Sequence, residues 1–283
     1  MTKIIDGKII SAEIRKDLAE KISVLKEKNI KIGLAVVLVG QNPASQVYVR
    51  NKIKACEDTG IKSFAYYLPE DITESELKEL VVSLSANKDI NGILVQLPLP
   101  KTINESNILK LIPPEKDVDG FSAVNVGNLL LNEKTLVACT PFGVLQMLKH
   151  ENIEISGKNA VIIGRSNIVG KPMAMLLLHE NATVTICHSK TQNLKEICSK
   201  ADILVAAIGK PKFVTADMVK QGAVVIDVGI NRIDGKLCGD VDFENIKDKT
   251  SYITPVPGGV GPMTITMLLK NTYIATLRSN NID

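Results

Sequence analysis

Short runs of β-branched and apolar residues alternate along this chain with longer segments of helical period. This alternation is typical of a mainly parallel β-sheet covered by helices, because parallel strands need long crossover connections. The predicted strands cover 33–40, 62–68, 91–98, 159–164, 182–187, 202–209 and 222–229. The sequence therefore predicts an α/β fold.

Predicted helices near 43–59 and 73–87 separate the strands of the first half. In the second of these, Thr73 is the expected N-cap, and Glu76 stands at the capping-box position three residues later. A further apolar helix is expected over 122–131, between the sequences KDVDGF and CTPFG. The character of the chain changes in this stretch, so we expect a domain junction there.

Composition excludes several classes of protein. A chain of 283 residues has room for one large domain or two ordinary ones, and its net charge of +3 comes without a basic block, which argues against nucleic-acid binding. The chain has neither an apolar run of membrane-spanning length nor the apolar core of a signal peptide, so we expect a cytoplasmic protein that does not insert into membranes. Its five scattered cysteines include no CxxC motif, which favours reduced thiols over disulfides or a metal site.

The segment PVPGGVGPMT (255–264) is rich in proline and glycine and precedes an apolar, helix-like C-terminus. Proline fixes φ whereas glycine permits positive φ and close approach of the backbone, so the composition predicts a shaped, non-regular loop. Such a loop either holds a ligand or forms a rigid turn between domains.

The predicted strand 159–164 runs into a turn that Gly164 and Gly170 flank at the start of a helix. A dinucleotide pyrophosphate occupies such a turn in a Rossmann unit, although the pattern GxSxxxG is irregular and also suits a simple tight turn. No carboxylate follows the next strand, where an NAD enzyme places one for the ribose. Arg165, with Ser189 or Lys190, could instead meet a 2′-phosphate, which favours NADP over NAD.

In the first half, Tyr48 and Lys52 are four residues apart and share one face of the predicted helix. Gln96 ends a neighbouring predicted strand, and ligand sites of open α/β sheets form at the carboxyl ends of strands. A solvated lysine and a packing tyrosine are the structural alternatives, whereas a polar Gln96 after a buried strand needs a specific partner. Asp117 and Asp119 stand in KDVDGF, where turn chemistry is the alternative to a binding role.

Five motifs in order, YVRNK, VQLPLP, KDVDGF, GRSNIVGKP and PVPGGVGPMT, resemble the bifunctional methylenetetrahydrofolate dehydrogenase/methenyltetrahydrofolate cyclohydrolase family. The resemblance runs from the opening DGK to the terminal helix. It implies an α/β catalytic, folate-binding domain over 1–121, completed by a C-terminal helix at 263–283, and a Rossmann-like NADP-binding domain over 122–262. A folate cleft between the domains and a homodimer are usual in this family.

The same resemblance implies roles for individual residues. Lys52 matches the catalytic lysine, Tyr48 the tyrosine that stacks on the substrate, Gln96 the hydrogen-bond partner of the lysine, and Asp119 the carboxylate that binds the pterin. The implied NADP contacts are Gly164, Arg165, Ser166, Gly170, Ser189 and Ile230, and the implied folate contacts also include Gly261 and Pro262. No metal is implied.

The implied function is NADP-dependent oxidation of 5,10-methylenetetrahydrofolate to the methenyl compound and its hydrolysis to 10-formyltetrahydrofolate, in one-carbon metabolism and purine biosynthesis. Lys52 is the candidate base for the hydrolysis, and a neutral Gln96 could orient it without stabilising its charge. Two rival classes are a shikimate- or amino-acid-type dehydrogenase, which has no reason to carry YVRNK, VQLPLP and KDVDGF, and a non-catalytic folate-binding protein, which could lose Lys52 or the GRS turn.

Overall fold

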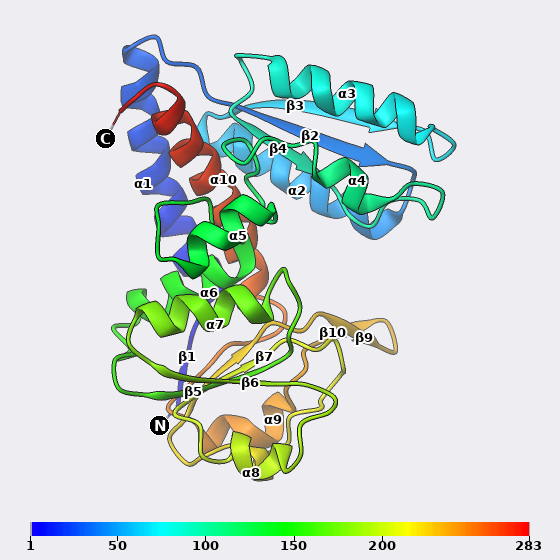
Figure 1. The fold of residues 1–283 in the computed structure, drawn as a ribbon. Coiled ribbons are helices and arrows are strands. Elements are labelled where there is room, and N and C mark those ends of the chain that lie inside the picture. Colours follow the sequence, from blue (N-terminus) through cyan, green and yellow to red (C-terminus); the bar gives the residue numbers. More distant parts are fainter. Residues whose placement is uncertain (1, 283) are drawn as a thin grey trace. The chain divides into compact units, whose positions relative to one another are not determined.

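The computed structural model describes residues 2–282, except the side chain of Ala44, and confirms the predicted α/β fold (Figure 1). The chain divides into two compact units. Unit 1 combines the N-terminal segment that ends at Ala12 with Thr140–Thr264, and unit 2 combines Glu13–Cys139 with the C-terminal segment from Ile265. None of the helices in the described part of the chain is long and apolar enough to cross a membrane.

The sheet of unit 2 is parallel and has the order β3-β2-β4, with β2 (Gly33–Val39), β3 (Lys62–Leu68) and β4 (Gly92–Val95). Helices α2 (Pro43–Thr59) and α3 (Glu74–Ala86) cover its opposite faces (Figure 1). Every residue of β2 is buried, as a central strand covered on both faces requires. Unit 2 also holds α4 (Glu105–Leu109), α5 (Ala123–Leu130) and most of α1 (Gly7–Glu27) and α10 (Val260–Ser279).

The sheet of unit 1 is parallel and has six strands in the order β1-β11-β8-β7-β5-β6. The strands are β1 (Lys3–Ile4), β5 (Asn159–Ile163), β6 (Thr183–Cys187), β7 (Ile203–Ala206), β8 (Val224–Asp227) and β11 (Tyr252–Ile253), and the helices are α6 (Cys139–His150), α7 (Gly170–His179), α8 (Leu194–Cys198) and α9 (Phe243–Ile246). Figure 1 shows α7 on one face of the sheet and α8 and α9 on the other. An antiparallel hairpin, β9 (Asn231–Ile233) and β10 (Lys236–Cys238), follows β8.

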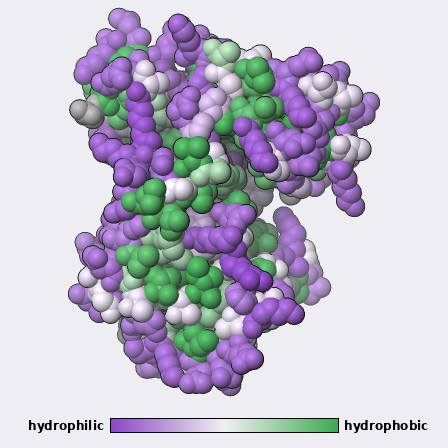
Figure 2. All heavy atoms as spheres, viewed as in Figure 1, coloured by the Kyte–Doolittle hydropathy of each residue, from purple (hydrophilic) through white to green (hydrophobic). Residues whose placement is uncertain are grey.

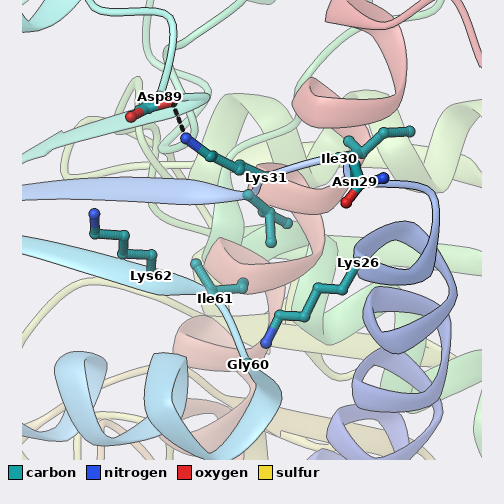
Figure 3. A pocket seen from close by; sticks show the side chains of 9 residues that line it. Lys26, Asn29, Ile30, Lys31, Gly60, Ile61, Lys62 and Asp89 are labelled. Atoms are coloured by element: carbon teal, nitrogen blue, oxygen red, sulfur yellow. Dashed lines mark hydrogen bonds and ion pairs between the residues drawn. The ribbon is translucent and has the colours of Figure 1, made fainter.

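Each unit has its own apolar core. One buried cluster joins β2, β4 and α3, and another joins β5, β7, β8 and α8. Hydrophilic residues cover most of the face drawn in Figure 2. This arrangement of buried strands and polar exterior agrees with the near-continuous apolar strands of the sequence.

The predicted domain boundary at 121/122 falls inside unit 2. Hydrogen bonds tie this region together, because the side-chain amide of Asn125 in α5 donates to Asp117 at 3.0 Å and to the carbonyl of Pro114 at 2.9 Å. At the N-terminus, β1 pairs with β11 and thereby joins unit 1. The assignment of folate binding and NADP binding to separate domains stays a prediction.

The proline- and glycine-rich segment is only partly irregular. Helix α10 begins at Val260, so the expectation of a loop over all of 255–264 is wrong for its second half, and the terminal helix starts before the predicted residue 263. Pro262 fits because the first helical turn needs no intrahelical N–H donor. Before the helix, Gly258 has φ +105° and Gly259 lies where a Cβ would overlap with the carbonyl of Pro255.

Candidate functional site

Lys52 and Gln96 form a hydrogen bond in unit 2. Lys52, on α2, is 9% exposed, and its Nζ donates to Gln96 Oε1 at 3.0 Å. Gln96 directly follows β4, and its backbone N–H donates to Val37 of β2 at 2.8 Å. Its side-chain amide donates to the carbonyl of Leu97 at 2.7 Å, which turns the amide oxygen toward the lysine. Gln96 therefore has the specific partner that its position predicted.

Asp119 lies close enough to Lys52 for their charges to interact. The segment before Asp119 runs beside β4, where Ile93 donates its N–H to Lys116 at 2.8 Å and bridges Asp117 in parallel. Burial raises the pKa of Asp119 to about 6, while the Lys52 ammonium lowers this pKa and the Asp117 carboxylate raises it. Asp119 is consequently mostly ionised at pH 7, beside a lysine.

Asp117, unlike Asp119, has a structural role. It is buried, and its carboxylate accepts the backbone N–H of Ser122 at 2.7 Å and the side-chain amide of Asn125 at 3.0 Å. Its carbonyl accepts the N–H of Gly120, which has φ +71°. Turn chemistry thus accounts for Asp117, whereas the side chain of Asp119 has Lys52 as a neighbour.

Tyr48 lies one turn before Lys52 on α2 and is 40% exposed, so it offers a ring face to a ligand. Cys56, one turn after Lys52, is fully buried, and burial raises the pKa of its thiol to about 12, which removes it as a nucleophile. The structure therefore brings Lys52, Gln96 and Asp119 together, with Tyr48 on the same helix as Lys52. Gly261 and Pro262 lie in the first turn of α10, and their contact with folate stays a prediction.

Sequence reasoning missed Asn271 of α10. It is buried, and its side-chain amide donates to the carbonyls of Val118 and Val137, both at 2.8 Å. These bonds hold the chain directly before Asp119. No local pattern signals such a contact, since the partners are 153 and 134 residues away in the sequence.

In unit 1 the turn after β5 is tightly packed. Gly164 has φ +127°, and a Cβ there would overlap with the carbonyl of Ala207, while a Cβ at Gly170 would overlap with the carbonyl of Gly164. The hydroxyl of Ser166 accepts the N–H groups of Val169 at 3.1 Å and Gly170 at 3.3 Å, so it caps the start of α7. Both glycines of the irregular fingerprint are therefore needed for this turn.

The turn fits the pyrophosphate of a dinucleotide. Residues 165–168 are exposed, and their backbone N–H groups donate to no residue in the described part of the chain. They belong to the turn that leads into α7, whose own first N–H groups, those of Gly170 and Lys171, donate to Ser166. Arg165 and Ser189 are exposed and follow β5 and β6, which are parallel neighbours, so a guanidinium and a hydroxyl follow the same end of the sheet, as a 2′-phosphate requires. Ile230, after β8, is 50% exposed.

Comparisons with known proteins identify the family to which the chain is similar. The catalytic-domain model of the tetrahydrofolate dehydrogenase/cyclohydrolase family matches residues 5–119, and its NAD(P)-binding-domain model matches residues 138–280. The bifunctional protein FolD of Agathobacter rectalis is 57% identical over 279 residues, which cover 98% of this chain and 100% of the relative.

Two solved structures are similar to this chain over all or nearly all of their length. The bifunctional FolD enzyme of Campylobacter jejuni has a TM-score of 0.97 at 52% identity, covering 99% of this chain and 100% of its own. The Trypanosoma brucei dehydrogenase-cyclohydrolase, solved with NADP cofactor and an inhibitor, has a TM-score of 0.94 at 40% identity, covering 99% of this chain and 98% of its own. The chain belongs to the tetrahydrofolate dehydrogenase/cyclohydrolase family, which confirms the resemblance of its five ordered motifs.

Proposed function

We propose that this protein catalyses two consecutive reactions of one-carbon metabolism, the NADP-dependent oxidation of 5,10-methylenetetrahydrofolate and the hydrolysis of the resulting methenyl compound to 10-formyltetrahydrofolate. The observation that carries the proposal is the 3.0 Å bond between Lys52 and Gln96, with Asp119 beside the lysine. It is supported by membership of a bifunctional family along nearly the whole chain.

Asp119 and Tyr48 orient the folate in this proposal. An ionised Asp119 accepts two parallel hydrogen bonds from the 2-amino and ring N–H groups of the pterin, which fixes the orientation of the ring as well as its affinity. The exposed ring of Tyr48 supplies a flat apolar face for the substrate. Both residues belong to unit 2, the same unit as Lys52.

The oxidation step depends on orientation more than on proton transfer. NADP+, when bound, supplies the acceptor for the hydride that leaves the one-carbon bridge. Gly164, Ser166 and Gly170 shape the turn that holds the pyrophosphate, and Arg165 and Ser189 bind the 2′-phosphate. These residues act by fixing the position of the reacting ring.

The hydrolysis step needs proton transfer. Water adds to the methenyl carbon and loses one proton, which leaves a neutral hydroxyl adduct. The bond from that carbon to N5 then breaks as the hydroxyl loses its proton to become the formyl oxygen and N5 takes up a proton, so one proton is released overall. Lys52 moves these protons at Nζ, and Gln96 orients the ammonium group through its amide oxygen. The neutral amide orients Nζ without adding a second carboxylate to the one that Asp119 already places beside the lysine.

The test mixes purified protein with 5,10-methylenetetrahydrofolate and NADP+ and follows methenyl absorbance and NADPH, with NAD+ in a parallel reaction. We expect NADP-dependent formation of the methenyl compound followed by its decay to 10-formyltetrahydrofolate. Absence of both signals with either nucleotide would contradict the proposal.

We further infer a homodimer in the cytoplasm. Strand β3 is at the edge of its sheet, pairs with β2, and carries Tyr67 with 63% exposure, which supports association with a second copy of the chain. Light scattering of the wild type and of Tyr67→Glu tests the dimer, since a charge at this edge should shift the mass toward that of one chain.

The inference of a cytoplasmic location is supported by the cysteines. All five are free thiols, which suits a reducing compartment.

A further inference from the structure

Two buried carboxylates in unit 1 have no part in the reactions above. Asp227 ends β8 and is 3% exposed, and Asp240 follows the β9–β10 hairpin and is fully buried. An ionised carboxylate is costly to bury unless several donors surround it, so the partners of these two groups indicate what each one stabilises.

Asp240 organises the loop that follows β7. Its Oδ2 accepts the backbone N–H groups of Ile208 at 2.7 Å and Gly209 at 3.0 Å. Its Oδ1 accepts the N–H of Lys210 at 2.8 Å and the side-chain amide of Asn231 at 2.9 Å. Three successive N–H groups therefore converge on one carboxylate, which fixes the conformation of 208–210 and joins it to the hairpin.

Asp227 holds the two ends of the hairpin together. Its Oδ1 accepts the N–H groups of Gly229 at 3.0 Å and Asp240 at 2.9 Å, and its Oδ2 accepts that of Val241 at 2.9 Å. Its own N–H donates to the hydroxyl of Thr254 at 2.7 Å. The chain thus leaves β8 and returns to the same carboxylate, and the loop with Ile230 lies between these points.

Two glycines make room for the carboxylates. A Cβ at Gly229 would overlap with the side chain of Asp240, and a Cβ at Gly239 would overlap with the side chain of Asp227. Asp240 therefore packs on Gly229, two residues after Asp227, and Asp227 packs on Gly239, the residue before Asp240. We call Asp227 and Asp240, which pack in this reciprocal way, the aspartate pair. A side chain at either glycine would disturb this packing.

The aspartate pair lies next to the turn that fits the pyrophosphate. Ala207 donates its N–H to Ile163 at the end of β5 at 2.8 Å, and its carbonyl lies against Gly164. Val228 likewise donates to Ala206 at the end of β7 at 2.9 Å. The loops that the pair fixes therefore leave the same edge of the sheet as the turn after β5.

We propose that Asp227 and Asp240 are positioning residues of the NADP site, which hold the loop 207–210 and the loop with Ile230 in the conformation that receives the nucleotide. The inference rests on the proposed placement of NADP at the turn after β5. The N–H groups of 208–210 donate to Asp240 and are not available to the nucleotide. In this proposal the loop therefore contacts the nucleotide through its carbonyls and side chains.

The experiment compares Asp240→Asn and Asn231→Ala with the matched control Asp234→Asn. Asp234 is exposed at the tip of the same hairpin and has φ +49°, which asparagine also adopts readily, so the control removes the same charge without touching the pair. Binding of NADP+ is measured by calorimetry without folate, and cyclohydrolase activity on the methenyl compound is measured without nucleotide.

We expect Asp240→Asn to weaken NADP+ binding at least tenfold and Asn231→Ala, which removes one of four donors, to weaken it severalfold. Cyclohydrolase activity should stay within twofold of the wild type in both. Unchanged NADP+ affinity in either variant overturns the inference, as does a parallel loss of both properties in Asn231→Ala, which would mean a purely structural role. If Asp240→Asn does not fold, Asn231→Ala decides. Failure of the wild type and Asp234→Asn to bind NADP+ would instead contradict the proposed nucleotide site.

Discussion

At the residue scale, the surroundings of Lys52 set it apart from the other lysine near it on α2. Lys52 is buried and bonded to a neutral amide, whereas Lys54 is exposed and pairs with Asp58 at 3.4 Å. We expect Lys52→Met to lower cyclohydrolase activity by about 10²-fold or more, because general acid–base groups contribute about 10² to 10⁴. NADP-dependent oxidation should remain measurable, since it needs no proton transfer from this residue.

The control for this prediction is Lys54→Met, which removes the same charge from an exposed position two residues away. Both activities of that variant should be close to those of the wild type. The measurement is the rate of methenyl decay and, separately, the initial rate of NADPH formation. Equal retention of both rates in Lys52→Met would rule out the assignment of Lys52 as the proton-transfer group.

Asp119 gives a prediction about pH. Burial raises its pKa to about 6, and the form that accepts hydrogen bonds from a pterin is the ionised one. Affinity for a folate analogue, measured by calorimetry, should therefore be constant above about pH 7 and fall by up to about tenfold per pH unit below 6. Asp119→Asn should bind weakly and lose this pH dependence. Equal affinity of the wild type at pH 5 and pH 8 would contradict the role of Asp119.

At the element scale, the sequence predicted what local chemistry determines. The strand 62–68, the helix 43–59 and the capping box of Thr73 and Glu76 agree with the structure, because period and capping are properties of neighbouring residues. The hairpin β9–β10 and the two-residue strands β1 and β11 went unpredicted. Strands β1 and β11 depend on partners that are distant in the sequence. The hairpin pairs locally across Asp234 and Gly235, an aspartate-glycine turn signal that the sequence analysis did not use.

The capping box of α3 gives a prediction about stability. The hydroxyl of Thr73 accepts the N–H of Glu76 at 3.2 Å, and the Glu76 carboxylate accepts the N–H of Thr73 at 2.9 Å. Thr73→Ala should lower the free energy of unfolding by about 1 kcal/mol, because a helix loses one cap acceptor. Ser83→Ala, at an exposed interior position of the same helix, is the control and should have a small effect. Urea unfolding followed by circular dichroism measures both, and an unchanged midpoint for Thr73→Ala would contradict the prediction.

At the scale of the whole molecule, how far the site was predictable depended on where its residues lie in the chain. Lys52 and Gln96 were predictable because they follow neighbouring strands of one parallel sheet, whose carboxyl ends share an edge. Asn271 and the pair of Asp227 and Asp240 were not, because their partners become neighbours only when the chain folds. A buried carboxylate has no period and no motif, so the fold alone identifies what it binds.

Two carboxylates with raised pKa values, Asp227 of unit 1 and Asp119 of unit 2, shape the pH dependence of stability. Burial raises the pKa of Asp227 to about 7 and that of Asp119 to about 6, whereas an unfolded aspartate titrates near 4. Between these values the native chain binds protons that the unfolded chain has released, so stability falls as pH rises from about 4 to 7. The ion pair and hydrogen bonds of Glu74 lower its pKa to about 2, which has the opposite effect at lower pH.

The molecule should therefore be more stable near pH 5 than at pH 7.5, by an amount on the order of 2 kcal/mol at constant ionic strength. The measurement is the midpoint of thermal unfolding at the two pH values. Asp227→Asn should reduce the difference, because asparagine does not titrate, while Asp234→Asn at the exposed hairpin tip should leave it unchanged. A wild-type midpoint that rises from pH 5 to pH 7.5 would mean that the backbone donors around Asp227 outweigh its burial, and the carboxylate would then stabilise the native state as an anion.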